Sequence, residues 1–164
     1  MKNLNKYLIL IVVALTTTIY SQVRSDWGIG ITLGDPTGFT AKYNVNPTNA
    51  WNFNIGSSYF GEIRMGADYL WHFDPFNSRY VAMHAGFGGV LGFGEGRSLV
   101  FSNGDDDFFV RDNEVGLGVR GLVGIDFYPS SSPFEIFFEM GPLIGLVPDV
   151  GSALDIAVGF RFYP

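Results

Sequence analysis

The sequence predicts an all-β fold, in the form of an eight-stranded antiparallel up-and-down transmembrane β-barrel. Three observations lead to this prediction. Residues alternate with a period of two along eight segments between residues 25 and 164, as they do in β-strands. Turn-forming residues separate these segments. Finally, one face of the strands is bulky and uncharged, whereas the other combines small residues with ions of both signs.

The composition excludes several classes of protein. Of the 164 residues, 22 are glycine, and aromatic and charged residues each make up 16%. Such a chain has too many apolar groups to remain disordered. The net charge of −6 and the lack of a basic stripe argue against nucleic acid as a partner. Because the chain has no cysteine, disulfides, thiolate metal sites, a cysteine nucleophile and a lipidated amino terminus are excluded.

Residues 1–21 are typical of a secretory signal peptide. Lys2 and Lys6 precede an apolar run at 7–15, and cleavage is predicted after Ser21. The alternative is a membrane-anchor helix, which needs roughly 20 apolar residues. The run is well short of that length, so we expect residues 22–164 to form the barrel of an exported protein.

Turn residues divide the remaining chain, because proline, glycine, asparagine and aspartate adopt the backbone angles that tight turns need. The predicted turns are GDPTG (34–38), NPTN (46–49), GSSYFG (56–61), DPFN (74–77), a long loop at 94–113, PSSSP (129–133) and PDVG (148–151). The first four predicted strands are WGIGITLG (27–34), GFTAKYNV (38–45), WNFNIG (51–56) and EIRMGADYLWHFD (62–74). The last four are YVAMHAGFGGVLGF (80–93), VGLGVRGLVGIDF (115–127), FEIFFEMGPLIGL (134–146) and ALDIAVGFRFY (153–163).

The less apolar face decides which side of the sheet is inside. A water-facing strand surface is usually rich in threonine and long charged residues and avoids glycine. This face instead carries small residues, which suit the narrow interior of an eight-stranded barrel, and nearly balanced charges, which buried ions require. We therefore expect the bulky face to contact lipid. The alternative is a soluble periplasmic barrel or sandwich with the apolar face inward. The residues expected to form an internal charge network are Lys42, Arg64, Asp68, Arg120, Asp126, Glu135, Glu139, Asp155 and Arg161.

An even number of strands places both ends of the barrel chain on one side, which we expect to be the periplasm. The 94–113 loop then lies outside the cell. Aromatic residues of the bulky face collect at the predicted periplasmic ends, as an interfacial girdle would. The girdle residues are Trp27, Tyr43, Trp51, Trp71, Phe73, Phe127, Phe134, Phe160 and Phe162.

A family of small bacterial proteins of unassigned function, found in spirochaetes and other Gram-negative lineages, resembles this chain over most of residues 27–164. The resemblance is carried by LGDPTGFTAKYNVNPTNAWNFNIG (33–56), ADYLWHF (67–73), GLGVRGLVGI (116–125), PFEIFFEMGPLIGLVPDVG (133–151) and the ending GFRFYP (159–164). It implies an outer-membrane barrel similar to OmpA and OmpX. It implies no catalytic residues.

Three further motifs have features of binding sites. GIGITLG (28–34) superficially suggests a phosphate loop, but it leads into a strand, whereas such loops precede a helix. NGDDD (103–107), with Asp112 and Glu114 nearby, could hold a hard cation but lacks the ligand spacing of an EF-hand. The rings of Phe101, Phe108 and Phe109 are expected either to form a contact surface on the long loop or to fold back onto the barrel rim.

The two histidines are expected to be structural members of the charge network, with His72 near the periplasm and His84 in mid-lumen. We expect a non-enzymatic barrel with a plugged lumen and no cofactor, which is structural, adhesive or ligand-contacting through its outer loops. The alternative from another class is a lipid-modifying barrel enzyme, which would need a serine or an aspartate within hydrogen-bond reach of a histidine at the outer rim. Expected partners are outer-membrane lipid, the barrel-assembly machinery during insertion and an extracellular ligand of unknown identity.

Overall fold

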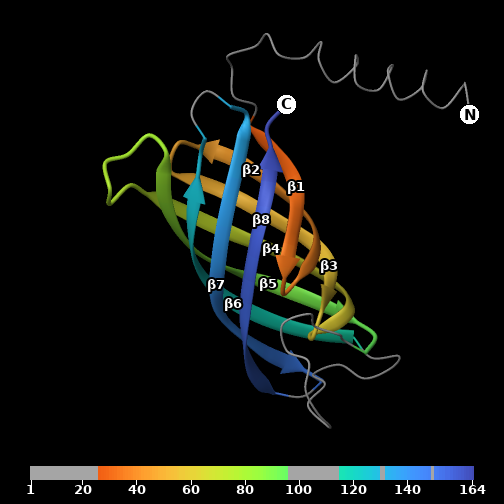
Figure 1. Cartoon of the computed structure of the whole chain (residues 1–164). Helices are drawn as coiled ribbons and strands as arrows, with labels where there is room; N and C mark the ends of the chain where they lie inside the picture. The colour runs from red at the N-terminus through yellow and green to blue at the C-terminus, as the bar shows by residue number, and fades with distance from the viewer. Residues whose placement is uncertain (1–25, 96–114, 130–131, 149) are drawn as a thin grey trace, which may run out of the picture.

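The computed structural model describes residues 26–95, 115–129, 132–148 and 150–164. These residues form eight antiparallel strands that follow one another around a closed barrel, in which β1 pairs with both β2 and β8 (Figure 1). The predicted all-β fold with eight antiparallel strands is thus confirmed. The strands are β1 Trp27–Gly34, β2 Thr37–Asn46, β3 Asn49–Ser58, β4 Gly61–Phe73, β5 Val81–Phe93, β6 Val115–Phe127, β7 Phe134–Val147 and β8 Gly151–Phe162.

Several predictions lie outside the described residues. They concern the signal peptide at 1–21, the acidic stretch at 103–107, and the three loop aromatics Phe101, Phe108 and Phe109. Within the described ranges, no helix is long and apolar enough to cross a membrane.

The turns after β1 and β3 are much shorter than the sequence suggests. The turn between β1 and β2 contains only residues 35–36, and Gly34 enters it with a φ of 123°, a value that favours glycine. The turn between β3 and β4 contains only residues 59–60, whereas the prediction spans 56–61. Gly56 belongs to the ladder, opposite Gly38. A Cβ atom at Gly56 would lie 2.2 Å from the Thr37 carbonyl oxygen, so glycine serves a close strand approach there.

Side chains alternate between the two faces of the barrel wall. In β6, exposed residues alternate with buried ones from Val115 to Phe127, with Gly121 of intermediate exposure, and β7 shows the same pattern along nearly its whole length. Alternation with this period follows from strand geometry. Residues of one parity therefore point outward from the barrel, and residues of the other parity point into its interior, which we call the lumen.

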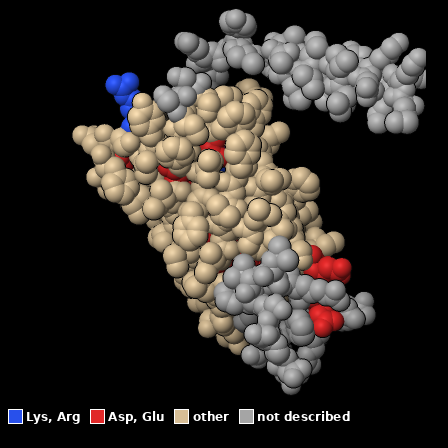
Figure 2. All heavy atoms as spheres, in the orientation of Figure 1, with Lys and Arg blue, Asp and Glu red and all other residues tan. Residues whose placement is uncertain are grey.

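The distribution of apolar and charged residues is inverted relative to a water-soluble domain. Among the described residues, 34 large hydrophobic side chains are exposed, whereas nine hydrophobic residues are buried. Figure 2 shows one face of this outer wall, covered mainly by residues other than lysine, arginine, aspartate and glutamate, with the protruding charged residues near the two ends. Within the eight strands, Glu62 at one rim is the single charged residue that is not buried.

The lumen is less uniformly polar than the sequence suggests. Two small apolar clusters lie among its ions. One contains Ala50, Leu70 and Leu122, and the other contains Phe60, Val90 and Leu143 beside the β3–β4 turn. Ions and apolar side chains together fill the interior, as the small diameter of an eight-stranded barrel allows.

Candidate functional site

The strand register brings the nine charged residues predicted for the interior into one buried network. Each is less than 7% exposed. A tenth charged residue, Asp35, joins them from the β1–β2 turn and is fully buried. We call these ten residues the ion network: Asp35, Lys42, Arg64, Asp68, Arg120, Asp126, Glu135, Glu139, Asp155 and Arg161.

Arg64 organises the network at the end of the barrel that carries the β1–β2 and β3–β4 turns. Its guanidinium pairs with Asp155 through both terminal nitrogens, and Nη1 also donates to the Asp35 carboxylate at 3.3 Å and to the Ser58 hydroxyl at 3.1 Å. The Tyr59 hydroxyl donates to Asp155 at 2.6 Å. Burial and the adjacent carboxylate raise the pKa of Tyr59, so its phenol stays a neutral donor.

Arg120 links this end to the middle of the lumen. Its Nε donates to Asp68 Oδ1 at 2.7 Å, its Nη2 donates to the second oxygen of the same carboxylate, and its Nη1 donates to Asp155 at 3.2 Å. Nη2 also lies 3.6 Å from Glu139. Such a two-pronged pairing is the strong geometry for arginine and carboxylate. Two asparagine amides of β3 complete the surroundings of Asp68 by donating to it, those of Asn52 and Asn54.

Glu135 is the centre of the network at the other end, where the described chain begins and ends. Arg161 donates to it at 2.5 Å, Lys42 donates to both of its oxygens at 3.2 and 3.3 Å, and the Tyr163 hydroxyl donates to it as well. The Arg161 guanidinium also lies over the Phe137 ring, 3.7 Å from its centroid. Burial and the Glu135 charge raise the pKa of Tyr163, which therefore acts as a neutral donor.

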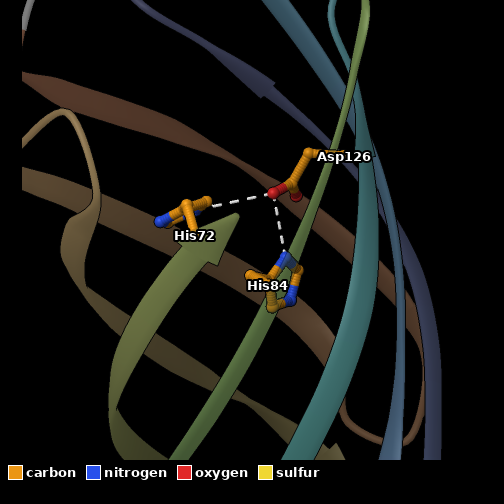
Figure 3. A group of neighbouring side chains, drawn as sticks. All are labelled: His72, His84 and Asp126. Atoms are coloured by element: carbon orange, nitrogen blue, oxygen red, sulfur yellow. Dashed lines mark hydrogen bonds and ion pairs between the residues drawn. The ribbon is translucent and has the colours of Figure 1, made fainter. Parts of the chain in front are cut away.

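A second group at this end consists of His72, His84 and Asp126, which we call the histidine cluster (Figure 3). His84 Nδ1 lies 2.9 Å from Asp126 Oδ2, and His72 Nε2 lies 3.5 Å from the same oxygen. The placement of His84 in mid-lumen, apart from His72, was therefore wrong. The β4–β5 connection sets a register in which the two histidines are direct cross-strand partners, and alternation alone carries no information on that register.

The buried charges of the described lumen do not balance. The ion network contains six carboxylates against four basic groups, an excess of two negative charges. The sequence suggested a smaller excess because Asp35 was interpreted only as a turn residue. The two histidines face this negative interior.

The nine predicted girdle residues lie on the outer wall, within four residues of strand ends that meet at the end where β1 begins and β8 finishes. Six of them are exposed and three are half-buried. The exposed six are Trp27, Trp51, Trp71, Phe73, Phe127 and Phe160, and the half-buried three are Tyr43, Phe134 and Phe162.

Three further rings extend this belt and were missed in the sequence. Phe53 stacks on both Trp27 and Trp51, with ring centroids 6.4 Å apart in each pair. Tyr69 packs edge-on between Trp51 and Trp71, at 5.1 and 5.2 Å. Phe87 stacks on Trp71 at 5.8 Å. Each lies on the outer row of its strand, a signal that was available, but each sits closer to mid-strand than the predicted girdle.

The outer wall also carries a shallow groove across β1–β4 with a volume of about 750 Å³. Its lining is largely apolar and includes Ile31, Phe39, Phe53 and Met65. The groove therefore suits an apolar chain better than a polar ligand.

Comparison of the chain with known protein families, with curated proteins and with solved structures returned no match. The function must therefore be argued from the barrel itself. Its lumen holds the ion network and two apolar clusters, and its outer wall is apolar.

Proposed function

We propose that this protein is a non-enzymatic outer-membrane β-barrel with a plugged lumen, which serves a structural, adhesive or ligand-contacting role through its outer loops. The observation that carries the proposal is the charge distribution across the wall. Nine of the ten charged residues within the strands point inward and are buried, and the outward rows are apolar around all eight strands.

Water is an unfavourable surrounding for such a wall. A soluble monomer rarely exposes a contiguous apolar patch larger than roughly 300–600 Å², whereas this apolar surface continues from strand to strand around the closed barrel. In hydrocarbon, exposure of the same apolar surface carries no hydrophobic free-energy penalty. Closure matters too, because lipid offers no partner for an unpaired backbone group and a closed barrel has no unpaired edge.

The strand lengths fit a bilayer. A transmembrane strand needs about 9–11 residues, and β2 and β3 contain 10 residues while β4 to β8 contain 12 to 14. β1 is shorter, with 8 residues. The belt of rings then lies at the membrane–water boundary, where aromatic side chains are favoured, and the outer groove takes lipid acyl chains.

We place the end of the barrel where β1 begins and β8 finishes in the periplasm, because a secreted precursor would leave its termini there. The 94–113 segment connects β5 to β6 at the opposite end, which is then extracellular. In this arrangement the partners are outer-membrane lipid, the assembly machinery during insertion and an extracellular ligand that contacts the loops. The loop phenylalanines Phe101, Phe108 and Phe109 stay a predicted contact surface.

The two alternative functions find less support. A soluble ligand-binding barrel needs an apolar interior cavity, but the described lumen is crossed by the ion network. A lipid-modifying barrel enzyme would act at the outer leaflet, whereas both histidines lie at the other end, and within the described residues neither forms a hydrogen bond with a serine. His84 does bond to an acid, Asp126, but this pair lies at the end of the barrel opposite the proposed outer face.

Planar bilayer recording tests the plugged lumen. We expect no steady channel when purified, folded protein is added, because buried ions and two apolar clusters occupy the lumen. A large porin added afterwards to the same bilayer verifies that insertion and detection work. Reproducible steady conductance of porin size, absent with heat-denatured protein, would contradict the proposal.

A further inference from the structure

We propose that the histidine cluster is a binding site for a first-row transition-metal dication, Zn²⁺ or Cu²⁺, with His72, His84 and Asp126 as ligands. The inference rests on the lumen geometry and does not depend on the membrane location proposed above. Three observations on the described residues carry it: the spacing of the donor atoms, the unpartnered atoms among them and the charge of their surroundings.

The donor atoms lie near, but not yet at, coordination spacing. One atom from each of the three residues can be chosen so that all lie within 4.8 Å of one another. Metal–ligand bonds of about 2.0–2.2 Å in tetrahedral geometry place neighbouring ligand atoms roughly 3.3–3.6 Å apart. Asp126 Oδ2 lies 3.5 Å from His72 Nε2 and 2.9 Å from His84 Nδ1. Small side-chain adjustments therefore suffice to bind an ion.

Three polar atoms of the cluster are buried without a hydrogen-bond partner. They are His72 Nε2, His84 Nε2 and Asp126 Oδ1. Both His84 and Asp126 have fully buried side chains, and the side chain of His72 is 11% exposed. Leaving such a group unsatisfied costs about 1–3 kcal/mol. A cation held by His72 Nε2, His84 Nδ1 and Asp126 satisfies His72 Nε2 and the Asp126 carboxylate, and it leaves His84 Nε2 to face the Glu139 carboxylate 3.9 Å away.

The charge of the interior favours a dication. The ion network has two more carboxylates than basic groups, so one divalent ion neutralises the excess. Lys42 is the nearest competing cation, with Nζ 3.7 Å from Asp126 Oδ2. Nζ lies closer to Glu135, at 3.2 Å, so Lys42 can remain paired with Glu135 while Asp126 turns to the metal. The Glu139 carboxylate, 3.9 Å from His84 Nε2, adds further negative potential.

The donor set selects the class of metal. Imidazole nitrogen suits zinc, copper and nickel, whereas calcium and magnesium prefer oxygen ligands alone. The partial exposure of His72 at the barrel end provides a path of entry. Because the chain contains only these two histidines, metal binding through imidazole can arise nowhere else in it.

The test uses the folded protein in detergent, purified without a polyhistidine tag. Calorimetric titration should show one Zn²⁺ bound per chain, and millimolar Ca²⁺ should not displace it, which separates this site from the acidic stretch at 103–107. Removing a group that only hydrogen-bonds to a metal ligand lowers metal affinity about 10–100-fold. His72 and His84 are ligands themselves, so His72→Gln and His84→Gln should each weaken Zn²⁺ binding at least about tenfold. The control Glu62→Gln removes an exposed carboxylate at the other rim and should bind as the wild type does.

Equal Zn²⁺ affinity in the wild type and in both histidine variants would overturn the proposal, as would the absence of binding to the wild type. Heat-modifiable gel migration verifies that each variant is folded. If a variant does not fold, the site is tested by electron paramagnetic resonance of Cu²⁺ bound to the wild type. Hyperfine coupling to two imidazole nitrogens is expected, and a spectrum without nitrogen coupling contradicts the site.

Discussion

Replacing Arg120 by methionine should lower the free energy of unfolding by about 3–5 kcal/mol, the cost of breaking a buried ion pair from one side. Arg120 is the link between three carboxylates, those of Asp68, Glu139 and Asp155. Its loss leaves Asp68 with only amide donors and removes the one arginine near Glu139 among the described ion pairs. Urea unfolding in lipid vesicles, followed by tryptophan fluorescence, measures the change.

Two further variants isolate the cause. Arg79→Met makes the same substitution at an exposed position between β4 and β5 and should change stability by less than about 0.5 kcal/mol. Adding Asp68→Asn to the Arg120→Met variant should restore part of the loss, because it removes a carboxylate left without its cation; the coupling appears in a double-mutant cycle. If Arg120→Met were as harmless as Arg79→Met, the lumen would be solvated and the ion network of little consequence.

A lysine placed on the outer wall should be costly for a different reason. Val119 lies near the middle of β6 and points outward. In a bilayer, Val119→Lys should reduce the free energy of unfolding by about 2–4 kcal/mol, the cost of a basic residue near the membrane midplane. The same titration in vesicles measures it.

Val150→Lys is the matched control. Val150 is 81% exposed in the connection between β7 and β8, at the water-facing end in our proposal, where the cost should be about 0–1 kcal/mol. A soluble barrel would tolerate both substitutions equally. Equal stability of the two lysine variants would therefore rule out lipid as the surrounding of β6.

The fold and the membership of the ion network were predictable from the sequence. The face to which a strand residue points depends only on parity, that is, on whether its position along the strand is odd or even. Once a segment such as 115–127 was recognised by its alternation, Arg120 and Asp126 had to share a face, opposite Val119. Parity needs no knowledge of neighbouring strands. It therefore applies to every strand of the barrel.

Parity could not predict the register between neighbouring strands, which decides which residues lie opposite each other. The pairing of His72 with His84 depends on the length of the β4–β5 connection, and the same holds for the contact of Tyr69 with Trp51 across β3 and β4. The direction of side chains in turns could not be predicted from parity either. Asp35 lies in a two-residue turn, and its carboxylate points back into the lumen to meet Arg64, whereas its sequence context indicated only a turn.

The orientation of the wall can be measured directly by spin labelling of single cysteines, since the chain has no cysteine of its own. Nitroxides at Leu117, Val119, Val123 and Ile125 report on the outward row of β6 in vesicles, and a label at Val150 provides the water-exposed reference. We predict that the four outward labels collide readily with oxygen, which concentrates in hydrocarbon, and rarely with a water-soluble nickel chelate. Frequent collision of these four labels with the nickel chelate, at the level of Val150, would contradict a lipid-facing barrel.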